Sequence, residues 1–365
     1  MRVRFKKIKE ISGGLATSSL IALISIYISH HLGVSLLGFS DSPISPVVIA
    51  IMLGMTLKNR INLPESLNQG LQFSSEQILR FGIILMGIRI GLNDMVGYGM
   101  KSLMVVVPLI ISIIYLVKLF RKFIKIPPKL TTLIAVGTSI CGATAITAIS
   151  PVIGARKEEV GYAIANVTIF GLIAMILYPI LANNIFPNDA ISAGIFLGSS
   201  IHETAQVAGA GLIYSDYYNQ DAVLNISTIT KLMRNTAMIF IIPYFSIQYL
   251  ESKDTYQNNY IGNIISTFPK FIIGFIILGI VRNIGDIGII NFNLAFGFIK
   301  AEIWNELIAY LVKLSKFSLI VAMSAVGMKI KFSSIKTIGP LASFYGFIIS
   351  CSVGLISLTL IKLFV

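Results

Sequence analysis

The stretch GTSICGAT, residues 137–144, lies in the middle of an apolar segment at residues 130–152. The stretch GSSIHET, residues 198–204, interrupts a second apolar segment, residues 190–213, in the same way. Glycine permits a break in the backbone, and Ser and Thr cap a half-helix that begins after it. Inside a membrane, irregular backbone is tolerated only where protein or a water-filled cavity covers it. These runs predict two interrupted or re-entrant helices that meet near the bilayer midplane. Packing of small residues between helices is the alternative.

The rest of the chain predicts an all-α polytopic membrane protein. Of its 365 residues, 55% are hydrophobic and only 12% are charged, and its mean hydropathy is +0.83, whereas soluble domains carry about 25% charged residues. Apolar runs that can cross a bilayer core of about 30 Å recur throughout. We expect a single transmembrane domain, residues 1–365, with about eleven segments: 12–36, 44–57, 76–95, 101–122, 130–152, 159–182, 190–213, 223–250, 264–282, 308–328 and 337–362. Residues 283–307, which contain Trp304, predict a helix that lies in the membrane interface.

The net charge of +13 follows from basic residues at the ends of segments, chiefly within residues 1–10 and 118–129. The positive-inside rule places both stretches in the cytoplasm, so we expect a cytoplasmic N-terminus and no nucleic-acid partner. Cys141 and Cys351 both lie in apolar segments, which does not indicate a disulfide framework.

Internal similarity predicts an inverted repeat. GIRIGLNDM at residues 87–95 aligns with GMKIKFSSI at 327–335, and GTSI at 137–140 aligns with GSSI at 198–201. The first repeat would cover about residues 44–182 and the second about 190–362, after an extra N-terminal helix at 12–36. Inversion requires the segments at 130–152 and 190–213 to be re-entrant hairpins that enter from opposite faces. Broken helices that span the membrane fully remain the alternative.

Two ionisable residues, His202 and Glu203, fall inside the second interruption. Ionisable groups within a membrane are functional candidates by default, and both of these can change protonation near neutral pH. A structural hydrogen-bonded pair is the alternative. The string His-Glu-x-x resembles the start of a zinc-protease motif, but its fifth residue is Gln206 rather than His. We therefore expect proton coupling from His202 and Glu203, a hydrogen bond to substrate from Gln206, and no metal.

Two cations, Lys231 and Arg234, fall within the eighth apolar segment, on one helical face with Thr228 and Asn235. Cations inside a membrane span need a partner, which Glu203 or a bound anion can supply. If the segment begins later in the chain, both side chains can instead extend to the outer interface.

Four motifs then show a family resemblance: SICGATAI (139–146), VTIFG (167–171), GSSIHETAQV (198–207) and KLMR (231–234). Together they resemble the YeiH-type sulfate exporter family of bacterial inner-membrane proteins, within the bile acid, arsenite and riboflavin transporter superfamily. The resemblance extends over about residues 15–360 and implies an anion transporter with inverted repeats and interrupted helices. Where the family often has Asn followed by Ser, this chain has Ala143 and Thr144, which keeps a hydroxyl and removes an amide.

We therefore expect a secondary active transporter, coupled to protons, that exports a small inorganic or sulfur-containing anion such as sulfate, sulfite or a sulfonate. The expected substrate-binding residues are Ser139, Cys141, Gly142, Thr144, Ser199, Ser200, Gln206, Lys231 and Arg234. The expected partners are this anion and the lipid bilayer, and the sequence leaves homo-oligomerisation, substrate identity, direction and coupling ion open. A passive anion channel is the first alternative. A membrane-embedded enzyme is disfavoured, because the sequence shows no nucleophile–base–metal set. No ATP-binding P-loop is present, so a primary pump would need a partner subunit, and we expect no cofactor.

Overall fold

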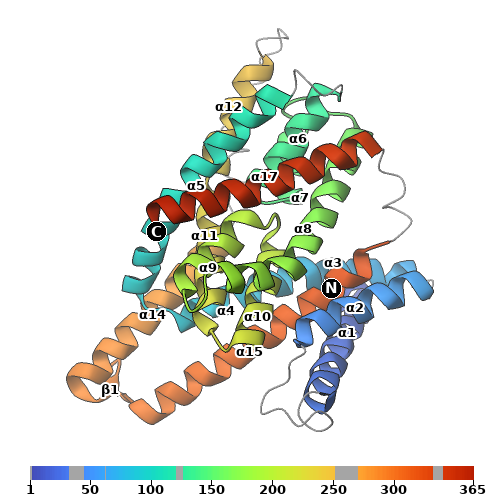
Figure 1. Cartoon of the computed structure of the whole chain (residues 1–365). Helices are drawn as coiled ribbons and strands as arrows, with labels where there is room; N and C mark the ends of the chain where they lie inside the picture. Colours follow the sequence, from blue (N-terminus) through green and yellow to red (C-terminus); the bar gives the residue numbers. More distant parts are fainter. Residues whose placement is uncertain (1, 33–44, 62, 121–125, 251–269, 332–339) are drawn as a thin grey trace. The chain divides into compact units, whose positions relative to one another are not determined.

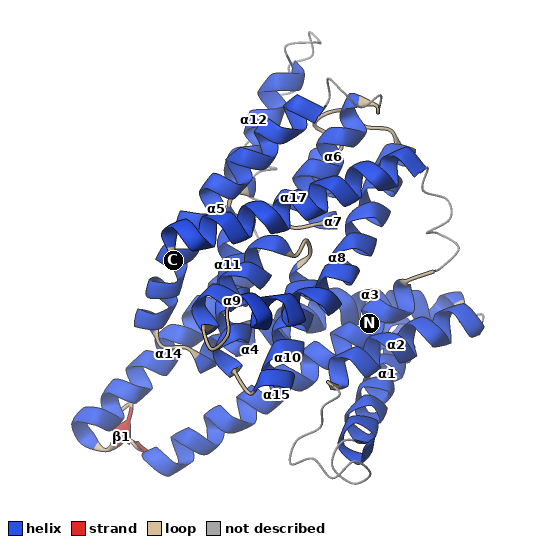
Figure 2. Cartoon of the chain, in the orientation of Figure 1, coloured by secondary structure: helices blue, strands red, loops and turns tan. Residues whose placement is uncertain are grey.

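The computed structural model describes residues 2–32, 45–61, 63–120, 126–250, 270–331 and 340–365 (Figure 1). Nearly all of these residues are helical (Figure 2). Within these ranges, six helices are long and apolar enough to cross a membrane. They are α1 (Arg2–His30), α5 (Leu92–Phe120), α8 (Lys157–Ile185), α14 (Phe271–Phe292), α15 (Ala301–Lys329) and α17 (Pro340–Phe364). The chain is therefore an all-α, multi-pass membrane protein, as predicted.

The remaining helices are shorter. They are α2 (Pro46–Arg60), α3 (Asn68–Phe73), α4 (Leu79–Met86), α6 (Pro128–Ser139), α7 (Ala143–Ile149), α9 (Ala190–Ser200), α10 (Thr204–Tyr218), α11 (Asp221–Thr236) and α12 (Met238–Leu250). Single turns connect some of them: η2 (Glu65–Leu67), η3 (Ser74–Ile78) and η4 (Gly87–Arg89). Each of the eleven predicted segments contains helix, but the number of membrane crossings stays a prediction. The eighth segment is divided, because α11 ends at Thr236 and α12 begins at Met238.

The chain forms two compact units. Unit 1 comprises Met1–Gly97, Gly211–Asn225 and Lys270–Phe332, and unit 2 comprises Tyr98–Ala210, Ile226–Pro269 and Ser333–Val365. Each unit takes residues from both halves of the sequence, so the units differ from the predicted repeats. The repeat boundaries stay a prediction.

In unit 1, α2 and α15 pack through small residues. A β-carbon added to Gly54 would meet backbone of α15 at Ser324, and one added to Gly327 would meet backbone of α2 at Ile51. Close backbone approach of this kind is typical of helix association in membranes. Ser324 of α15 also donates a hydrogen bond to the carbonyl oxygen of Ser18 on α1, at 2.8 Å. Helix α1 therefore contacts α15 at the same level as α2.

The predicted interfacial helix at 283–307 is wrong. Helix α14 continues to Phe292, and a two-stranded hairpin of β1 (Leu294–Ala295) and β2 (Ile299–Lys300) then leads into α15. Asn293, which caps the C-terminal end of α14, has a positive φ angle. The hairpin turn that follows has positive φ angles at Phe296 and Gly297. Trp304 is buried at 3% exposure, and its indole N–H donates to Asp286 at 3.0 Å, so its ring packs inside unit 1.

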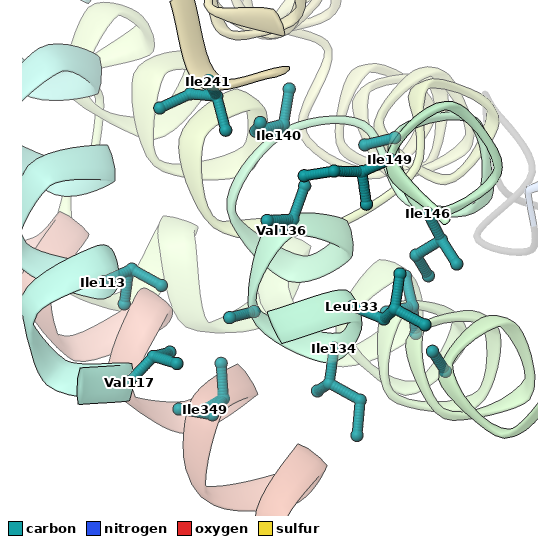
Figure 3. Close-up of a cluster of buried hydrophobic side chains, with 14 of the residues drawn as sticks. Ile113, Val117, Leu133, Ile134, Val136, Ile140, Ile146, Ile149, Ile241 and Ile349 are labelled. Carbon is teal, nitrogen blue, oxygen red and sulfur yellow. The ribbon is translucent and has the colours of Figure 1, made fainter. Parts of the chain in front are cut away.

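In unit 2, a continuous apolar core surrounds α6 and α7 (Figure 3). Helices α5, α12 and α17 contribute Ile113, Ile241 and Ile349 to this core. Every residue of α6 from Leu130 to Ser139 is buried, and α9 is buried from Ser192 to Ser200. Helices that are apolar and buried all round are interior elements. The protein itself therefore covers both helix ends at which the sequence predicted breaks.

Candidate functional site

The first break separates α6 from α7. Helix α6 ends at Ser139, Ile140 leaves the helical conformation with φ −120° and ψ −87°, and α7 begins at Ala143. Gly142 has φ +69°, a left-handed conformation that a residue with a β-carbon adopts only with strain. The N–H of Gly142 donates to the carbonyl of Gly137 at 2.8 Å, which satisfies one of the carbonyls at the end of α6. The predicted interruption is therefore present, and Gly142 occupies its left-handed position.

The second break separates α9 from α10. Helix α9 ends at Ser200, and Ile201, His202 and Glu203 form the link to α10 at Thr204. The Ser199 hydroxyl bonds to the carbonyl of Ile195 at 2.6 Å, and the Ser200 hydroxyl bonds to the carbonyl of Phe196. Both serine hydroxyls therefore point toward the preceding turn of α9.

Arg234 on α11 joins the two helix ends. Its Nε donates to the carbonyl of Ser139 at 2.7 Å, and its Nη2 donates to the carbonyl of Thr138, both on α6. Its Nη1 donates to the carbonyls of Ser199 and Ile201, the latter at 2.9 Å. The planar guanidinium with its five N–H groups suits acceptors that come from several directions. Arg234 is fully buried, and the hydrogen bonds that the structure shows for it all go to backbone carbonyls.

Lys231, one turn earlier on α11, makes the same kind of contact. Its ammonium group donates to the carbonyls of Ile140 at 2.8 Å and Ile201 at 3.0 Å, and also to the carbonyl of His202. Lys231 is fully buried too. The carbonyls at a helix C-terminus lack partners within the helix and carry the negative end of the helix dipole. Two cations therefore lie at the negative ends of two helix dipoles.

Glu203 connects the two breaks from the other side. Its Oε1 accepts from the backbone N–H of Ala143 and from the Thr168 hydroxyl on α8, each at 3.4 Å. Gln206 accepts a hydrogen bond from the Glu203 N–H at 3.1 Å, and its amide group donates to the Thr168 carbonyl at 3.1 Å. Gln206 therefore holds the start of α10 against α8. Gly171 on α8 makes room for it, since a β-carbon there would overlap the Gln206 amide.

His202 is buried at 1% exposure beside the same junction. Its Nε2 lies 2.8 Å from the Ser350 hydroxyl of α17, and its Nδ1 has no hydrogen-bond partner among the described residues. Cys141 is also buried, with its Sγ 3.2 Å from Sδ of Met238. Thr144, in contrast, is exposed on α7. Of the predicted substrate-binding set, Thr144 alone has an exposed side chain.

Three partners at the junction did not enter the predicted site. Ser350 contacts His202, Ser357 lies 2.5 Å from the Ser199 hydroxyl, and Asn235 donates to the Thr204 hydroxyl at 3.2 Å. Ser350 and Ser357 are seven residues apart, so they share a face of α17. This seven-residue spacing of two serines in an apolar segment was the sequence signal that could have indicated Ser350 and Ser357.

Unit 1 contains a separate polar cluster around the start of α11. Asp221 pairs with Arg89 at 2.8 Å and with Lys316 at 3.2 Å, and also accepts from Ser215. Burial raises the pKa of Asp221, but the Ser215 hydrogen bond and the two cations outweigh burial and hold this pKa below its ordinary value of 3.8. A cavity of about 410 Å³ lies here. Among the described residues, no group of three or more His, Cys, Asp or Glu side chains is placed to hold a metal.

The chain matches the family described as conserved hypothetical protein 698 over residues 13–345. It is 32% identical to a UPF0324 membrane protein of Clostridium tetani, over 96% of both chains. It is 29% identical to a UPF0324 membrane protein of Bacillus anthracis, over 98% of this chain and 96% of the relative. A third relative, from Fusobacterium nucleatum, is also 29% identical, over 88% of this chain and 90% of its own. No solved structure matches this chain.

Proposed function

The chain belongs to the family of conserved hypothetical protein 698, and from that premise we propose that it is a secondary active transporter for a small anion. The proposed location is the cell inner membrane, with the N-terminus in the cytoplasm. The cluster of basic residues near the N-terminus supports this orientation.

The pair of buried cations carries the proposal. Lys231 and Arg234 are fully buried and are hydrogen-bonded to uncharged carbonyls. Glu203 is the acidic side chain at the junction, and a single carboxylate offsets only one of the two positive charges. Helix C-termini offset only part of two positive charges, because each carries about half an elementary charge. The junction therefore has a surplus of positive charge in a poorly solvated environment, which favours an anion.

The cations would act on the anion mainly through their electric field, since their donors already serve backbone carbonyls. Direct hydrogen bonds would come from neighbouring groups at the breaks. The proposed binding set remains Ser139, Cys141, Gly142, Thr144, Ser199, Ser200, Gln206, Lys231 and Arg234. Glu203 and His202 lie beside the cations and are the proposed proton carriers, because a proton on Glu203 changes the net charge that the anion meets. The proposal assigns no catalytic residue and no cofactor.

Proteoliposomes test the proposal. Purified protein would be reconstituted, and uptake of labelled sulfate, sulfite and a small sulfonate would be measured with and without a pH gradient. We expect saturable uptake of at least one of these anions, and accumulation only when the gradient is present. Uptake that merely equilibrates, with the same rate in both conditions, would identify a passive anion channel. If none of the anions enters faster than into empty liposomes, the anion assignment is wrong.

A further inference from the structure

The ammonium group of Lys231 occupies a position that a free cation would suit. Its three acceptors are the backbone carbonyl oxygens of Ile140, Ile201 and His202. Ile140 follows the last residue of α6, and Ile201 follows the last residue of α9. Unwound carbonyls at half-helix C-termini are the groups with which transporters coordinate monovalent ions. In this protein the cation is part of the polypeptide.

The geometry also indicates the class of ion. The oxygens of Ile140 and Ile201 lie 2.8 Å and 3.0 Å from Nζ of Lys231. Divalent calcium binds oxygens at about 2.3–2.6 Å and prefers carboxylate ligands. All three carbonyls are uncharged, and those of Ile140 and Ile201 lie farther away than calcium ligands do, so the set suits a larger monovalent cation. Potassium and ammonium ions fit this description, and potassium is held by carbonyls alone in channel filters.

We infer that the carbonyls of Ile140, Ile201 and His202 form a site for one monovalent cation of the potassium or ammonium class, which Lys231 fills permanently. The two helix ends thereby stay together without an ion from solution. Resting on the proposed function, we infer further that anion transport by the parent protein needs no alkali-metal coupling ion. The positive charge that such an ion would bring is already present in the chain.

Lys231→Ala tests the site, because it removes the ammonium group and leaves space beside the carbonyls. Lys231→Met is the matched control, since Met also removes the charge but fills most of the same space with an apolar side chain. Both variants and the parent would be purified in detergent without any anion substrate other than chloride. Thermal unfolding would be followed in KCl, NH4Cl, NaCl and choline chloride at equal ionic strength, and binding of labelled rubidium would be measured directly.

We expect Lys231→Ala to gain a saturable rise in Tm of about 3 °C or more in KCl or NH4Cl relative to choline chloride. It should also bind about one rubidium ion per chain, as expected when one ion replaces one ammonium group. The parent and Lys231→Met should show neither effect. If Lys231→Ala folds only in KCl or NH4Cl, that result supports the site as well.

An identical response of Lys231→Ala and the parent in every salt would overturn the inference, as would a failure of Lys231→Ala and Lys231→Ser to fold in any of them. In liposomes, anion uptake by Lys231→Ala should depend on potassium or ammonium, whereas uptake by the parent should not. The binding experiment contains no transported anion. Rubidium binding by Lys231→Ala, together with no anion uptake by the parent protein, would therefore reject the proposed function and keep the cation site.

Discussion

Gly142 and Glu203 are in direct contact, one at each helix break. A β-carbon added to Gly142 would overlap Cγ of Glu203. Gly142 also has a φ of +69°, so its backbone conformation disfavours a side chain independently of the available space. The carboxylate of Glu203 is consequently held beside the start of α7, where its Oε1 meets the N–H of Ala143 at 3.4 Å.

Gly142→Ala is expected to lower stability by about 1–3 kcal/mol, from backbone strain and from displacement of Glu203. The matched control is Gly161→Ala on α8, because a β-carbon there meets no atom within 4 Å. In a helix that change should be neutral or stabilising by about 0.5–1 kcal/mol. Thermal unfolding in detergent, followed by circular dichroism, compares the two. Equal Tm values for both variants would show that the break does not depend on Gly142.

Arg234→Gln and Arg234→Lys separate charge from geometry. Each buried carbonyl that loses its donor costs about 1–3 kcal/mol, so both variants should unfold at lower temperature than the parent. Arg234→Gln should also weaken anion binding by about 2–4 kcal/mol, because it removes a buried charge. Arg234→Lys keeps the charge but lacks the planar fork, so its anion affinity should be closer to that of the parent. If Arg234→Gln binds the anion as tightly as the parent, the cations are purely structural.

Glu203→Gln is expected to leave anion binding in place and to abolish uptake driven by a pH gradient. Gln retains an oxygen that can accept from Ala143 and Thr168, but it cannot exchange a proton at neutral pH. Binding is measured by isothermal calorimetry and coupled uptake in liposomes. Glu158→Gln, at an exposed position near the start of α8, is the control and should behave like the parent. Gradient-driven uptake by Glu203→Gln at the parent rate would assign the proton to another group.

The re-entrant topology predicts the side from which two exposed positions are labelled. With Cys141 and Cys351 replaced by Ala, Lys157→Cys should react with an impermeant maleimide only from the cytoplasm, and Asn188→Cys only from outside. Both positions lie at exposed ends of the long helix α8 and its following loop. The reverse pattern would favour broken helices that span the membrane fully. Reaction of both positions from one side would contradict the crossing by α8.

Asp221 predicts a pH dependence of stability in unit 1. Its pKa is lower in the folded protein than the ordinary 3.8, so its stabilising contribution is present above pH 3.8 and is lost as the pH falls through the folded value. Its side chain is 55% exposed, and solvent screening therefore limits this contribution to about 1 kcal/mol or less. Asp221→Asn should lower Tm slightly at pH 7 and flatten the profile below pH 4. An unchanged profile would show that the pair with Arg89 contributes nothing to stability.

The helix breaks could be predicted because Gly, Ser and Thr gather in the middle of apolar runs, where these residue types favour helix ends. Gly142 and the link from Ile201 to Glu203 fall within the two quoted stretches. The membrane class followed from composition alone, since few charged residues are spread over long apolar runs. These properties are local, so periodicity and residue type suffice to predict them.

The partners of the cations could not be predicted in the same way. Arg234 contacts residues about 35 and 95 positions earlier in the chain, and its acceptors are carbonyls that every residue possesses. Nothing in a side-chain pattern marks a carbonyl as unpartnered until the helix that ends there is placed. The hairpin after α14 was missed for a related reason. Trp304 within residues 283–307 suggested an interfacial helix, whereas the positive φ angles at Asn293 and Phe296 became visible only in three dimensions.

Trp304 is the single tryptophan of the chain, and its buried indole bonds to Asp286 within the α14–α15 hairpin. Fluorescence excited selectively at tryptophan therefore arises from unit 1 alone. The two helix breaks, with Lys231 and Arg234, belong to unit 2. A denaturation experiment that records emission and far-ultraviolet ellipticity together can therefore observe whether the two units lose structure in one transition or in two. An unmodified chain thus carries its own optical label, in a different unit from Gly142, Glu203 and Arg234.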